Sequence, residues 1–210
     1  MTQPLGVILA GGRGTRMGHT DKATLILGGQ TLLQRAIDRL EPQVAALAIN
    51  TNTDLPTEFT RLPDSINGHP GPLAGILAAL DWAAAMGARH VVTVPVDVPF
   101  FPCDLVPRLL HAAEGMAHPL VLAATPRPEN ERTRSMSRSG LIRHPTFGLW
   151  PVALRDDLRA ALRDGLRKVV IWTEKHGGRE APFDGPGDPF FNVNTPDDLQ
   201  QARAMLESAS

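Results

Sequence analysis

The sequence predicts an α/β fold in which helices cover both faces of a mostly parallel sheet. Short apolar runs alternate with amphipathic runs along all 210 residues, as in chains built from repeated strand–helix units. The apolar runs are continuous, which indicates strands that are buried on both faces. The chain is long enough for one domain of ordinary size with a substantial core. We therefore expect a single domain over residues 1–210.

Five apolar runs have the length of buried strands and end at polar or glycine-rich segments. They are Leu5–Ala10, Val44–Asn50, Val91–Val96, Pro119–Ala124 and Phe147–Val152. Phe190–Val193 has the composition of either a short strand or a loop. Ligands of such sheets bind beyond the carboxyl ends of the strands. We therefore expect functional side chains in Gly11–Lys22, Asn50–Thr53 and Asp97–Pro99, each of which follows a strand.

Six segments carry apolar residues at helical spacing. They are Thr31–Glu41, Gly71–Met86, Pro102–Glu114, Arg155–Arg163, Lys168–His176 and a last helix from Thr195. Pro72 suits the first turn of its helix, while Thr195 and Pro196 supply a cap and a first helical residue for the last one. Pro107 lies inside the third segment, and we expect it to bend the first turns of that helix.

The long segment without a core pattern is 125–143, which reads TPRPENERTRSMSRSGLIR. It contains five arginines and almost no apolar residue before Leu141, so it cannot contribute to a core. A connection of this length in a compact domain is usually a functional lid or a disordered insert. We predict a mobile arginine-rich loop over 125–143 and leave both interpretations open.

The charge of the chain argues against nucleic acid or a membrane as partner. The formal net charge is −1, so there is no general basic excess. No apolar run approaches the length of a membrane span, and the first residues lack the features of a signal peptide. An anionic ligand must therefore meet a local positive site.

The chain has a single cysteine, Cys103, and cannot form an intramolecular disulfide. This favours a reducing compartment, and we expect a cytoplasmic protein. Cys103 has no Cys or His partner at metal-binding spacing. We expect it to be a buried or half-buried structural thiol.

The strongest local motif is LAGGRGTRMGHTDK, residues 9–22. Its four glycines allow a tight turn that exposes backbone N–H groups to an anion. Arg13, Arg16 and Lys22 add positive charge that can reach phosphate. The spacing matches neither a Walker loop nor a Rossmann dinucleotide fingerprint. An ordinary glycine-rich turn is the alternative, but the glycines together with these cations favour a phosphate-binding loop.

Asp97 stands at the end of an apolar strand, in VVTVPVDVP. That is where ligands bind in this architecture. One carboxylate combined with phosphate oxygens and waters is a usual way for proteins to hold Mg²⁺. The alternative is that Asp97 caps the turn before Pro99. We interpret Asp97 as the candidate ligand of one Mg²⁺ ion.

Four more polar residues are candidates on weaker grounds. Asp64 lies in a loop before a helix that starts with glycine and proline, where capping is the alternative. Asn192 and Asn194 alternate, so both can face one side of an extended segment, although they can equally belong to a helix cap. His144 precedes a proline at the end of the arginine-rich segment, and a surface histidine is the simpler interpretation.

In combination, these motifs resemble the molybdenum cofactor guanylyltransferase family, a branch of the nucleotidyltransferases. The matching segments follow the order of the family over nearly the whole chain. They are Leu9–Gly12, Arg16–Gly18, Asp21–Lys22, Gly71–Gly75, Asp97 with Pro99, His144–Thr146 and Asn192–Pro196. The first motif is specific only for the reaction class, whereas GPLAG together with NVNTP is much more specific. The resemblance implies a Rossmann-like, three-layer α/β/α fold of the glycosyltransferase-A type.

The resemblance also implies a reaction, in which GMP moves from GTP to the terminal phosphate of molybdopterin and pyrophosphate is released. It implies one Mg²⁺ at Asp97, with charge stabilisation by Arg16 and Lys22. Asn50 and Asp64 would contact the base or the ribose. The full set of implied nucleotide contacts is Leu9, Ala10, Gly11, Gly12, Lys22, Asn50, Asp64 and Asp97. Those implied on the pterin side are Asn192, Asn194 and His144. The expected partners are GTP and molybdopterin, with transient contacts to other cofactor-biosynthesis proteins or molybdoenzyme chaperones.

Three other functions stay open. A cytidylyltransferase that makes the cytosine form of the same cofactor would be expected to carry LAAG in the first motif, where this chain has Gly12. A sugar-phosphate nucleotidyltransferase shares the first motif and the strand-end aspartate but would not be expected to share HPT and NVNTP. A regulatory nucleotide-binding module without turnover would be expected to lack Asp97 or Lys22, and both are present. The segment 125–143 is longer than the corresponding connection in other members of the family. How the protein contacts the pterin near this segment therefore stays open.

Overall fold

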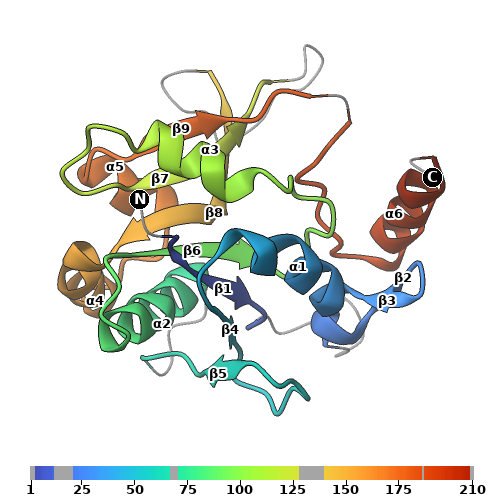
Figure 1. The fold of residues 1–210 in the computed structure, drawn as a ribbon, viewed down its shortest axis with the longest axis horizontal. Helices are drawn as coiled ribbons and strands as arrows, with labels where there is room; N and C mark the ends of the chain where they lie inside the picture. Colours follow the sequence, from blue (N-terminus) through green and yellow to red (C-terminus); the bar gives the residue numbers. More distant parts are fainter. Residues whose placement is uncertain (1–2, 12–20, 67–70, 128–139, 186, 209–210) are drawn as a thin grey trace.

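A seven-stranded sheet forms the centre of the computed structural model (Figure 1). The structure describes residues 3–11, 21–66, 71–127, 140–185 and 187–208. The strands of this sheet are β1 (Leu5–Leu9), β4 (Leu47–Asn50), β5 (Thr60–Leu62), β6 (His90–Pro95), β7 (Val121–Thr125), β8 (Ile142–Pro151) and β9 (Arg179–Pro182). Their order in space is β5-β4-β1-β6-β8-β7-β9, and of the seven only β8 runs antiparallel to its neighbours. The prediction of a mostly parallel sheet is confirmed.

Helices cover both faces of the sheet, and a separate apolar core fills the space on each side. The helices are α1 (Leu32–Leu40) and α3 (Leu105–Ala112) on one face, and α2 (Pro72–Ala85), α4 (Arg155–Arg163) and α5 (Val169–Lys175) on the other. Successive residues of β1 alternate between the two cores, because Ile8 packs with α1 and Val7 packs with α2. The three-layer α/β/α arrangement is therefore as expected. None of the helices in the described ranges is long and apolar enough to cross a membrane.

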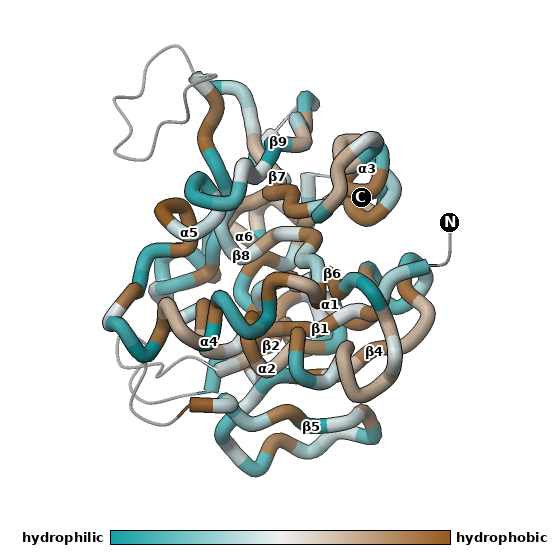
Figure 2. The backbone as a smooth tube through the Cα atoms, turned by 90° about the vertical axis from the view of Figure 1, so that its left-hand side faces the viewer, coloured by the Kyte–Doolittle hydropathy of each residue, from teal (hydrophilic) through white to brown (hydrophobic). Residues whose placement is uncertain are grey.

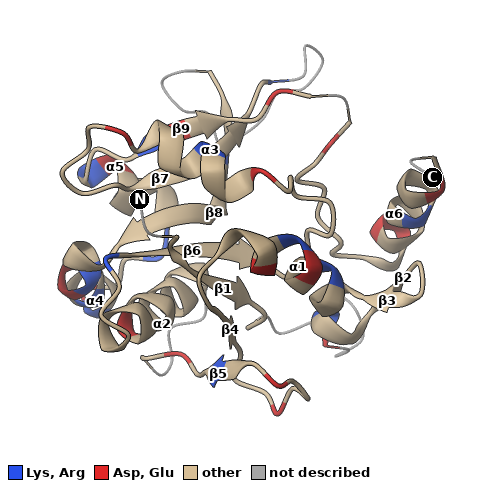
Figure 3. Cartoon of the chain, viewed as in Figure 1, with Lys and Arg blue, Asp and Glu red and all other residues tan. Residues whose placement is uncertain are grey.

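The strands at the middle of the sheet owe their position to their composition. β1, β4 and β6 contain no Lys, Arg, Asp or Glu, and Figure 3 shows the charged residues along the surrounding helices, loops and outer strands. The apolar segments of the tube in Figure 2 accordingly lie around the centre, over β1 and β6. Strands of this kind are stable only when both faces are covered.

The last helix, α6 (Pro196–Ser208), packs against a small hairpin to one side of the large sheet (Figure 1). The hairpin pairs β2 (Ile26–Leu27) with β3 (Gln30–Thr31). Its buried Leu27 shares a small core with Ala202 of α6. This contact brings the segment after the first glycine-rich motif close to the C-terminal part of the chain.

Several predicted boundaries are wrong. β4 begins at Leu47 instead of Val44, and α3 begins at Leu105. Pro107 is therefore the third residue of α3, where its missing N–H has no intrahelical acceptor to lose, so no bend is needed. For Phe190–Val193, where a short strand or a loop was expected, the structure has a turn and an irregular segment, so the loop alternative is confirmed. The strands β2, β3, β5 and β9 were not predicted, because runs of two to four residues carry too little periodicity to detect.

The predicted arginine-rich loop is shorter than expected at both ends. Thr125 is the last residue of β7, and Ile142 and Arg143 are the first two residues of β8. Residues 128–139, which include most of the arginines of that prediction, lie outside the described residues.

Cys103 is exposed, so the expectation of a buried or half-buried thiol is wrong. It lies in the turn before α3, where its Sγ accepts a hydrogen bond from Nη1 of Arg39 at 3.4 Å.

Candidate active site

Three side chains from distant parts of the chain meet beyond the carboxyl end of β6. Lys22 Nζ donates hydrogen bonds to Asp97 Oδ2 at 2.7 Å and to Asn194 Oδ1 at 2.5 Å. The Lys22 and Asp97 side chains are 18% and 20% exposed, so solvent screens the pair only partly while a ligand can still reach it. The sequence singled out all three residues as candidates, and the structure brings them together.

Backbone contacts hold Lys22 and Asp97 in place. Asp21 Oδ1 accepts from the Ala23 N–H at 3.0 Å and caps the short 3₁₀ helix η2 (Lys22–Thr24). Lys22 is the first residue of that helix, so its position is set by the cap. The carbonyl oxygen of Asp97 accepts from the Val193 N–H at 2.8 Å, which ties the NVN segment to the end of β6.

The start of α6 holds Asn194. Asp198 Oδ2 accepts from the backbone N–H groups of Asn194 at 2.9 Å and Thr195 at 2.8 Å. In return, Thr195 Oγ1 accepts from the Asp198 N–H at 3.2 Å, which completes a capping box. The hydrogen bond from the Asn194 N–H is the largest of several causes that lower the pKa of Asp198. The predicted helix start at Thr195 is confirmed, and it also orients a site residue.

A second polar cluster lies at the end of β4. Asn50 Nδ2 donates to Asp64 Oδ1 and to the Leu62 carbonyl oxygen, both at 3.0 Å. Asn52 Nδ2 donates to Asp64 Oδ2 at 2.8 Å, and the Asp64 N–H donates to Asn52 Oδ1 at 2.9 Å. The predicted contact residues Asn50 and Asp64 therefore lie together. Asn52 was missed, although its spacing from Asn50 equals that of the two asparagines in NVN.

Thr53 connects the two clusters. Its Oγ1 donates to Asp21 Oδ2 at 3.2 Å, and its N–H donates to Thr51 Oγ1 at 3.2 Å. The loop after β4 thus contacts Asp21, beside Lys22, and also Asp64. The clusters belong to one site along the edge of the sheet.

The first motif is described only at its start. Leu9 ends β1, its carbonyl oxygen accepts from the Val96 N–H at 3.1 Å, and the Ala10 N–H donates to the Asn50 carbonyl oxygen at 2.8 Å. Because that N–H is already used, a nucleotide contact from Ala10 has to involve its carbonyl oxygen. Gly11 is exposed at the same edge. Gly12 and Arg16, which the sequence also predicted, lie outside the described residues.

Asn50 presents its amide oxygen to two glycines of the site. The residue is 2% exposed, and its Nδ2 bonds fix which way the amide faces, because a carbonyl and a carboxylate can only accept. An ideal Cβ would lie 2.4 Å from Asn50 Oδ1 at Gly75 and 3.4 Å from it at Gly11. Within the described part of the chain no group donates a hydrogen bond to Asn50 Oδ1. It is therefore a buried acceptor beside the first motif.

Gly75→Ala is expected to destabilise the protein. The added methyl group would overlap Asn50 Oδ1, and the two hydrogen bonds of the Asn50 amide keep this side chain from moving away. Overpacking of this kind costs about 1–3 kcal/mol, against a helix-propensity gain of up to about 1 kcal/mol for replacing glycine. Urea unfolding measures the loss of stability. The pair Asn50→Ala with Gly75→Ala is the control, since removal of the overlapping oxygen should recover part of the stability. A Gly75→Ala protein as stable as the parent would contradict this packing.

The residues predicted on the pterin side differ in their surroundings. Asn194 belongs to the Lys22 cluster, whereas the exposed Asn192 donates from Nδ2 to the Phe190 carbonyl oxygen at 3.2 Å. His144 is half-buried, so the surface interpretation is wrong. Its ring stacks on Phe190 with centroids 4.1 Å apart, and its Nε2 lies 3.0 Å from Thr125 Oγ1. Burial lowers the pKa of His144 to about 4, so the imidazole is neutral near pH 7.

The antiparallel course of β8 explains the position of His144. The pairing of β6 with β8 ends at Thr93 and Gly148. The earlier residues of β8, with His144 among them, continue past that point in the direction in which β6 runs. They therefore extend toward the edge that holds Asp97.

The donor set beside Lys22 fits a hard cation. Asp97 and Asn194 both direct oxygen atoms at the Lys22 ammonium group, and carboxylate and amide oxygens are ligands that Mg²⁺ accepts. The described residues contain no cluster of three or more His, Cys, Asp or Glu side chains that could enclose a metal. Mg²⁺ usually takes one or two protein carboxylates and completes its shell with waters and substrate phosphates. The arrangement suits a metal that arrives with a nucleotide.

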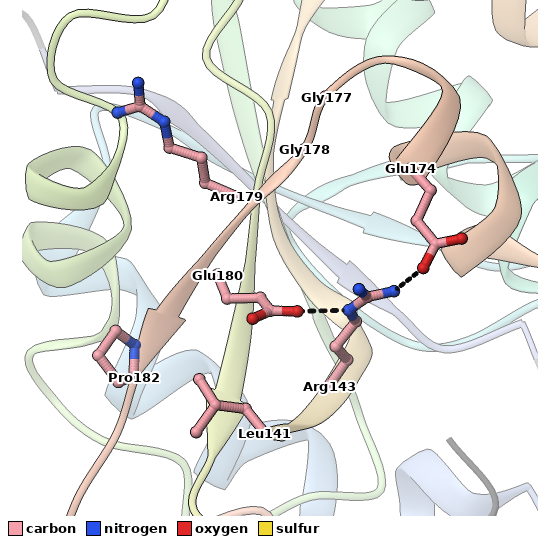
Figure 4. Close-up of a pocket in the computed structure, with 8 residues that line it drawn as sticks. All are labelled: Leu141, Arg143, Glu174, Gly177, Gly178, Arg179, Glu180 and Pro182. Carbon is pink, nitrogen blue, oxygen red and sulfur yellow. Dashed lines mark hydrogen bonds and ion pairs between the residues drawn. The ribbon is translucent and has the colours of Figure 1, made fainter. Parts of the chain in front are cut away.

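A cavity of about 610 Å³ lies elsewhere, beside the outer strand β9. Arg143 stands in its wall between two carboxylates, bonded to Glu180 Oε1 at 2.6 Å and to Glu174 Oε1 at 2.7 Å (Figure 4). The second arginine of the lining, Arg179, donates from Nη1 to the carbonyl oxygens of Ala112 and Glu114. Both arginines of this cavity are thus already bonded to acceptors, which makes it a poor place for an anion. The Lys22 edge is therefore the better candidate for an anion site.

Comparison with known proteins identifies the class of protein. A family model described as a MobA-like NTP transferase domain matches residues 6–177. This match includes the first motif, the β4 cluster and Asp97, so the fold and the site define a nucleotidyltransferase.

Curated relatives narrow the class. A molybdenum cofactor guanylyltransferase of Cereibacter sphaeroides is 45% identical over 204 residues, which is 96% of each chain. One of Rhizobium meliloti is 44% identical over 218 residues, covering 98% of this chain and 93% of that protein. The chain belongs to the molybdenum cofactor guanylyltransferase family. The crystal structure of molybdopterin-guanine dinucleotide biosynthesis protein A from Archaeoglobus fulgidus has the same fold, with a TM-score of 0.73, 22% identity and coverage of 97% of this chain and 99% of that one.

Proposed function

We propose that this protein transfers GMP from GTP to the terminal phosphate of molybdopterin, forming the guanine dinucleotide form of the cofactor and pyrophosphate. The observation that carries the proposal is the Lys22 ammonium between Asp97 and Asn194 at the end of the first glycine-rich motif. The site places a positive ammonium group next to a carboxylate at the edge of the sheet where nucleotides bind in this architecture. Membership of the family supports the choice of substrates.

In this reaction a phosphate oxygen of molybdopterin attacks the α-phosphorus of GTP and pyrophosphate leaves. The nucleophile is already ionised at neutral pH, so no side chain has to act as a general base. Catalysis then consists of positioning the two anions and stabilising their charge. Lys22 binds the triphosphate once it is released from Asp97, and Arg16 adds a second cation from the part of the motif outside the described residues.

We assign one Mg²⁺ to Asp97, with the Asn194 amide oxygen as a further ligand. When bound, the ion offsets the negative charge of the phosphates that would otherwise repel the nucleophile. Lys22 holds the two oxygen atoms together before nucleotide arrives. The same residue therefore keeps the metal ligands in place and later binds phosphate.

Asn50 and Asp64 hold the base or the ribose in this proposal. Asn50 Oδ1 is a buried acceptor, and Asp64 presents a carboxylate whose two oxygens each already accept one amide N–H. Acceptors of this kind suit the N–H groups of guanine or the hydroxyl groups of ribose. A base that leaves a buried acceptor unpaired costs about 1–3 kcal/mol, which favours GTP.

His144, Asn192 and Asn194 belong to the pterin side of the proposal. The neutral imidazole of His144, stacked on Phe190, gives a flat and weakly polar surface, which suits a planar ring better than a phosphate. A cytoplasmic location, and transient contacts with other cofactor-biosynthesis proteins or molybdoenzyme chaperones, complete the proposal.

The direct test is to incubate the protein with Mg²⁺, GTP and molybdopterin and to determine the mass of the pterin product. We expect a product that has gained one GMP, and pyrophosphate release only when molybdopterin is present. A competition assay with equimolar GTP and CTP shows which nucleotide the enzyme prefers. A mainly cytidylylated product would overturn the assignment of GTP as the substrate. Pyrophosphate release without any pterin would contradict the proposal that molybdopterin is the acceptor of GMP.

A further inference from the structure

Asn52 makes two hydrogen bonds to one residue of the nucleotide site and has no assigned role. Its amide meets Asp64 twice, through Nδ2 to the carboxylate at 2.8 Å and through Oδ1 from the backbone N–H at 2.9 Å. Asn52 is exposed in the loop after β4, while Asp64 lies in the segment after β5. The two bonds therefore clamp a loop residue at both its side chain and its backbone.

The chemistry of the partners fixes the direction of this clamp. A backbone N–H can only donate and an ionised carboxylate can only accept, so the Asn52 amide can satisfy both only in the orientation described. No other residue type of similar size supplies one donor and one acceptor in this geometry. Aspartate in its place would turn the donor into an acceptor and repel Asp64.

The clamp acts together with Asn50. Asn50 Nδ2 holds Asp64 Oδ1, and Asn52 Nδ2 holds Asp64 Oδ2. An aspartate on an exposed loop otherwise rotates freely about its side-chain bonds and loses that freedom when it binds a ligand. Here both oxygens are held beforehand, and each keeps a lone pair for a further donor. A carboxylate held in advance binds more tightly and discriminates better than a mobile one.

We propose that Asn52 is a positioning residue that fixes Asp64 for recognition of the nucleoside part of GTP, and that it thereby sets discrimination among nucleoside triphosphates. This inference rests on the assignment of Asp64 to the base or the ribose. Asn52 acts through Asp64 and does not itself touch the reacting phosphates. Its loss therefore affects KM and selectivity more than kcat.

The experiment is a double-mutant cycle of Asn52→Ala and Asp64→Ala, with kinetics measured for GTP, for ITP, which lacks the 2-amino group, and for 2′-deoxy-GTP. We expect Asn52→Ala to raise KM for GTP about ten-fold with kcat changed by less than about two-fold. If Asp64 binds the base, the preference of the Asn52→Ala variant for GTP over ITP should fall. If Asp64 binds the ribose, its preference for GTP over 2′-deoxy-GTP should fall instead. The double variant should be no worse than Asp64→Ala alone, because Asn52 has no other route to the nucleotide.

Asp54→Asn is the matched control, since Asp54 lies on the same loop and pairs with Arg61 instead of holding Asp64. It should leave KM and both preferences as in the parent. Asn52→Asp is a second variant, expected to impair GTP use at least as much as Asn52→Ala. Thermal unfolding of each variant confirms that it is folded.

Three outcomes would overturn the inference, and they are distinguishable. In the first, Asp64→Ala changes GTP use but its effect on KM and that of Asn52→Ala multiply in the double variant. In the second, Asn52→Ala lowers stability and kcat while both nucleotide preferences stay unchanged. Either result would mean that Asn52 only joins two loops. If Asp64→Ala itself leaves KM and both preferences unchanged, the assignment of Asp64 fails, and the role of Asn52 fails with it.

Discussion

Replacement of Asp97 by asparagine is expected to lower kcat by about 10³-fold, roughly 4 kcal/mol of transition-state stabilisation. The substitution keeps the shape of the side chain but removes the negative charge that faces Lys22, and with it the strongest of the oxygen ligands that we propose for Mg²⁺. The fold should persist, because the bond from the Val193 N–H goes to the Asp97 carbonyl oxygen, which asparagine retains. The measurement is kcat at saturating GTP and Mg²⁺, with thermal unfolding of the same samples.

Asp104→Asn is the control for that experiment. Asp104 lies on the same connection between β6 and α3, has a 60% exposed side chain and pairs only with Arg108 in the described structure. Exposed pairs contribute little, so its kcat should stay within about two-fold of the parent. If Asp97→Asn kept more than about a tenth of the parental kcat under excess Mg²⁺, a loss of under 1.4 kcal/mol, the metal role of Asp97 would be refuted.

Lys22→Ala is expected to lower kcat/KM for GTP by about 100-fold, roughly 2.7 kcal/mol, while the melting temperature shifts by only a few degrees. The substitution removes the cation that we propose to bind the triphosphate, and charge-assisted hydrogen bonds to phosphate are among the stronger ones. The stability cost is smaller because Asp97, left without its partner, is near enough to solvent to be hydrated. Steady-state kinetics against GTP concentration and thermal unfolding separate the two effects.

Lys168→Ala provides a matched loss of one lysine. Lys168 is exposed at the start of α5 and makes no side-chain capping bond, so kinetics should be unchanged. Equal GTP kinetics for Lys22→Ala and Lys168→Ala would remove Lys22 from the site. A Lys22→Ala protein that loses mainly stability would instead make the Lys22–Asp97 pair a structural contact.

Elements with strong local chemistry could be predicted from the sequence alone. Gly71 precedes Pro72 at the start of α2 with a φ of 145°, a conformation that favours glycine. Thr195 and Pro196 mark the start of α6 for the same kind of reason, since caps are local. The apolar run of β1 was equally clear, because burial on both faces leaves an uninterrupted pattern.

The partners of the site residues could not be predicted, because they depend on contacts between distant segments. The sequence suggested a phosphate for Lys22 and a metal for Asp97, but not that the two bind each other in the free protein. The clamp by Asn52 was missed because β5, which places Asp64, has only three residues. The burial of His144 was missed because the antiparallel course of β8 was not foreseen, and an extended residue before proline looks the same on a surface or inside a sheet.

The most direct measurement is a crystal structure of the protein with a non-hydrolysable GTP analogue and Mn²⁺, in which anomalous scattering locates the metal. We expect the metal bonded to an Asp97 carboxylate oxygen and to the triphosphate, with Lys22 Nζ moved from Asp97 to a phosphate oxygen. A triphosphate bound elsewhere, with the Lys22–Asp97 pair still closed and no metal at Asp97, would contradict the assignment of this edge of the sheet as the active site.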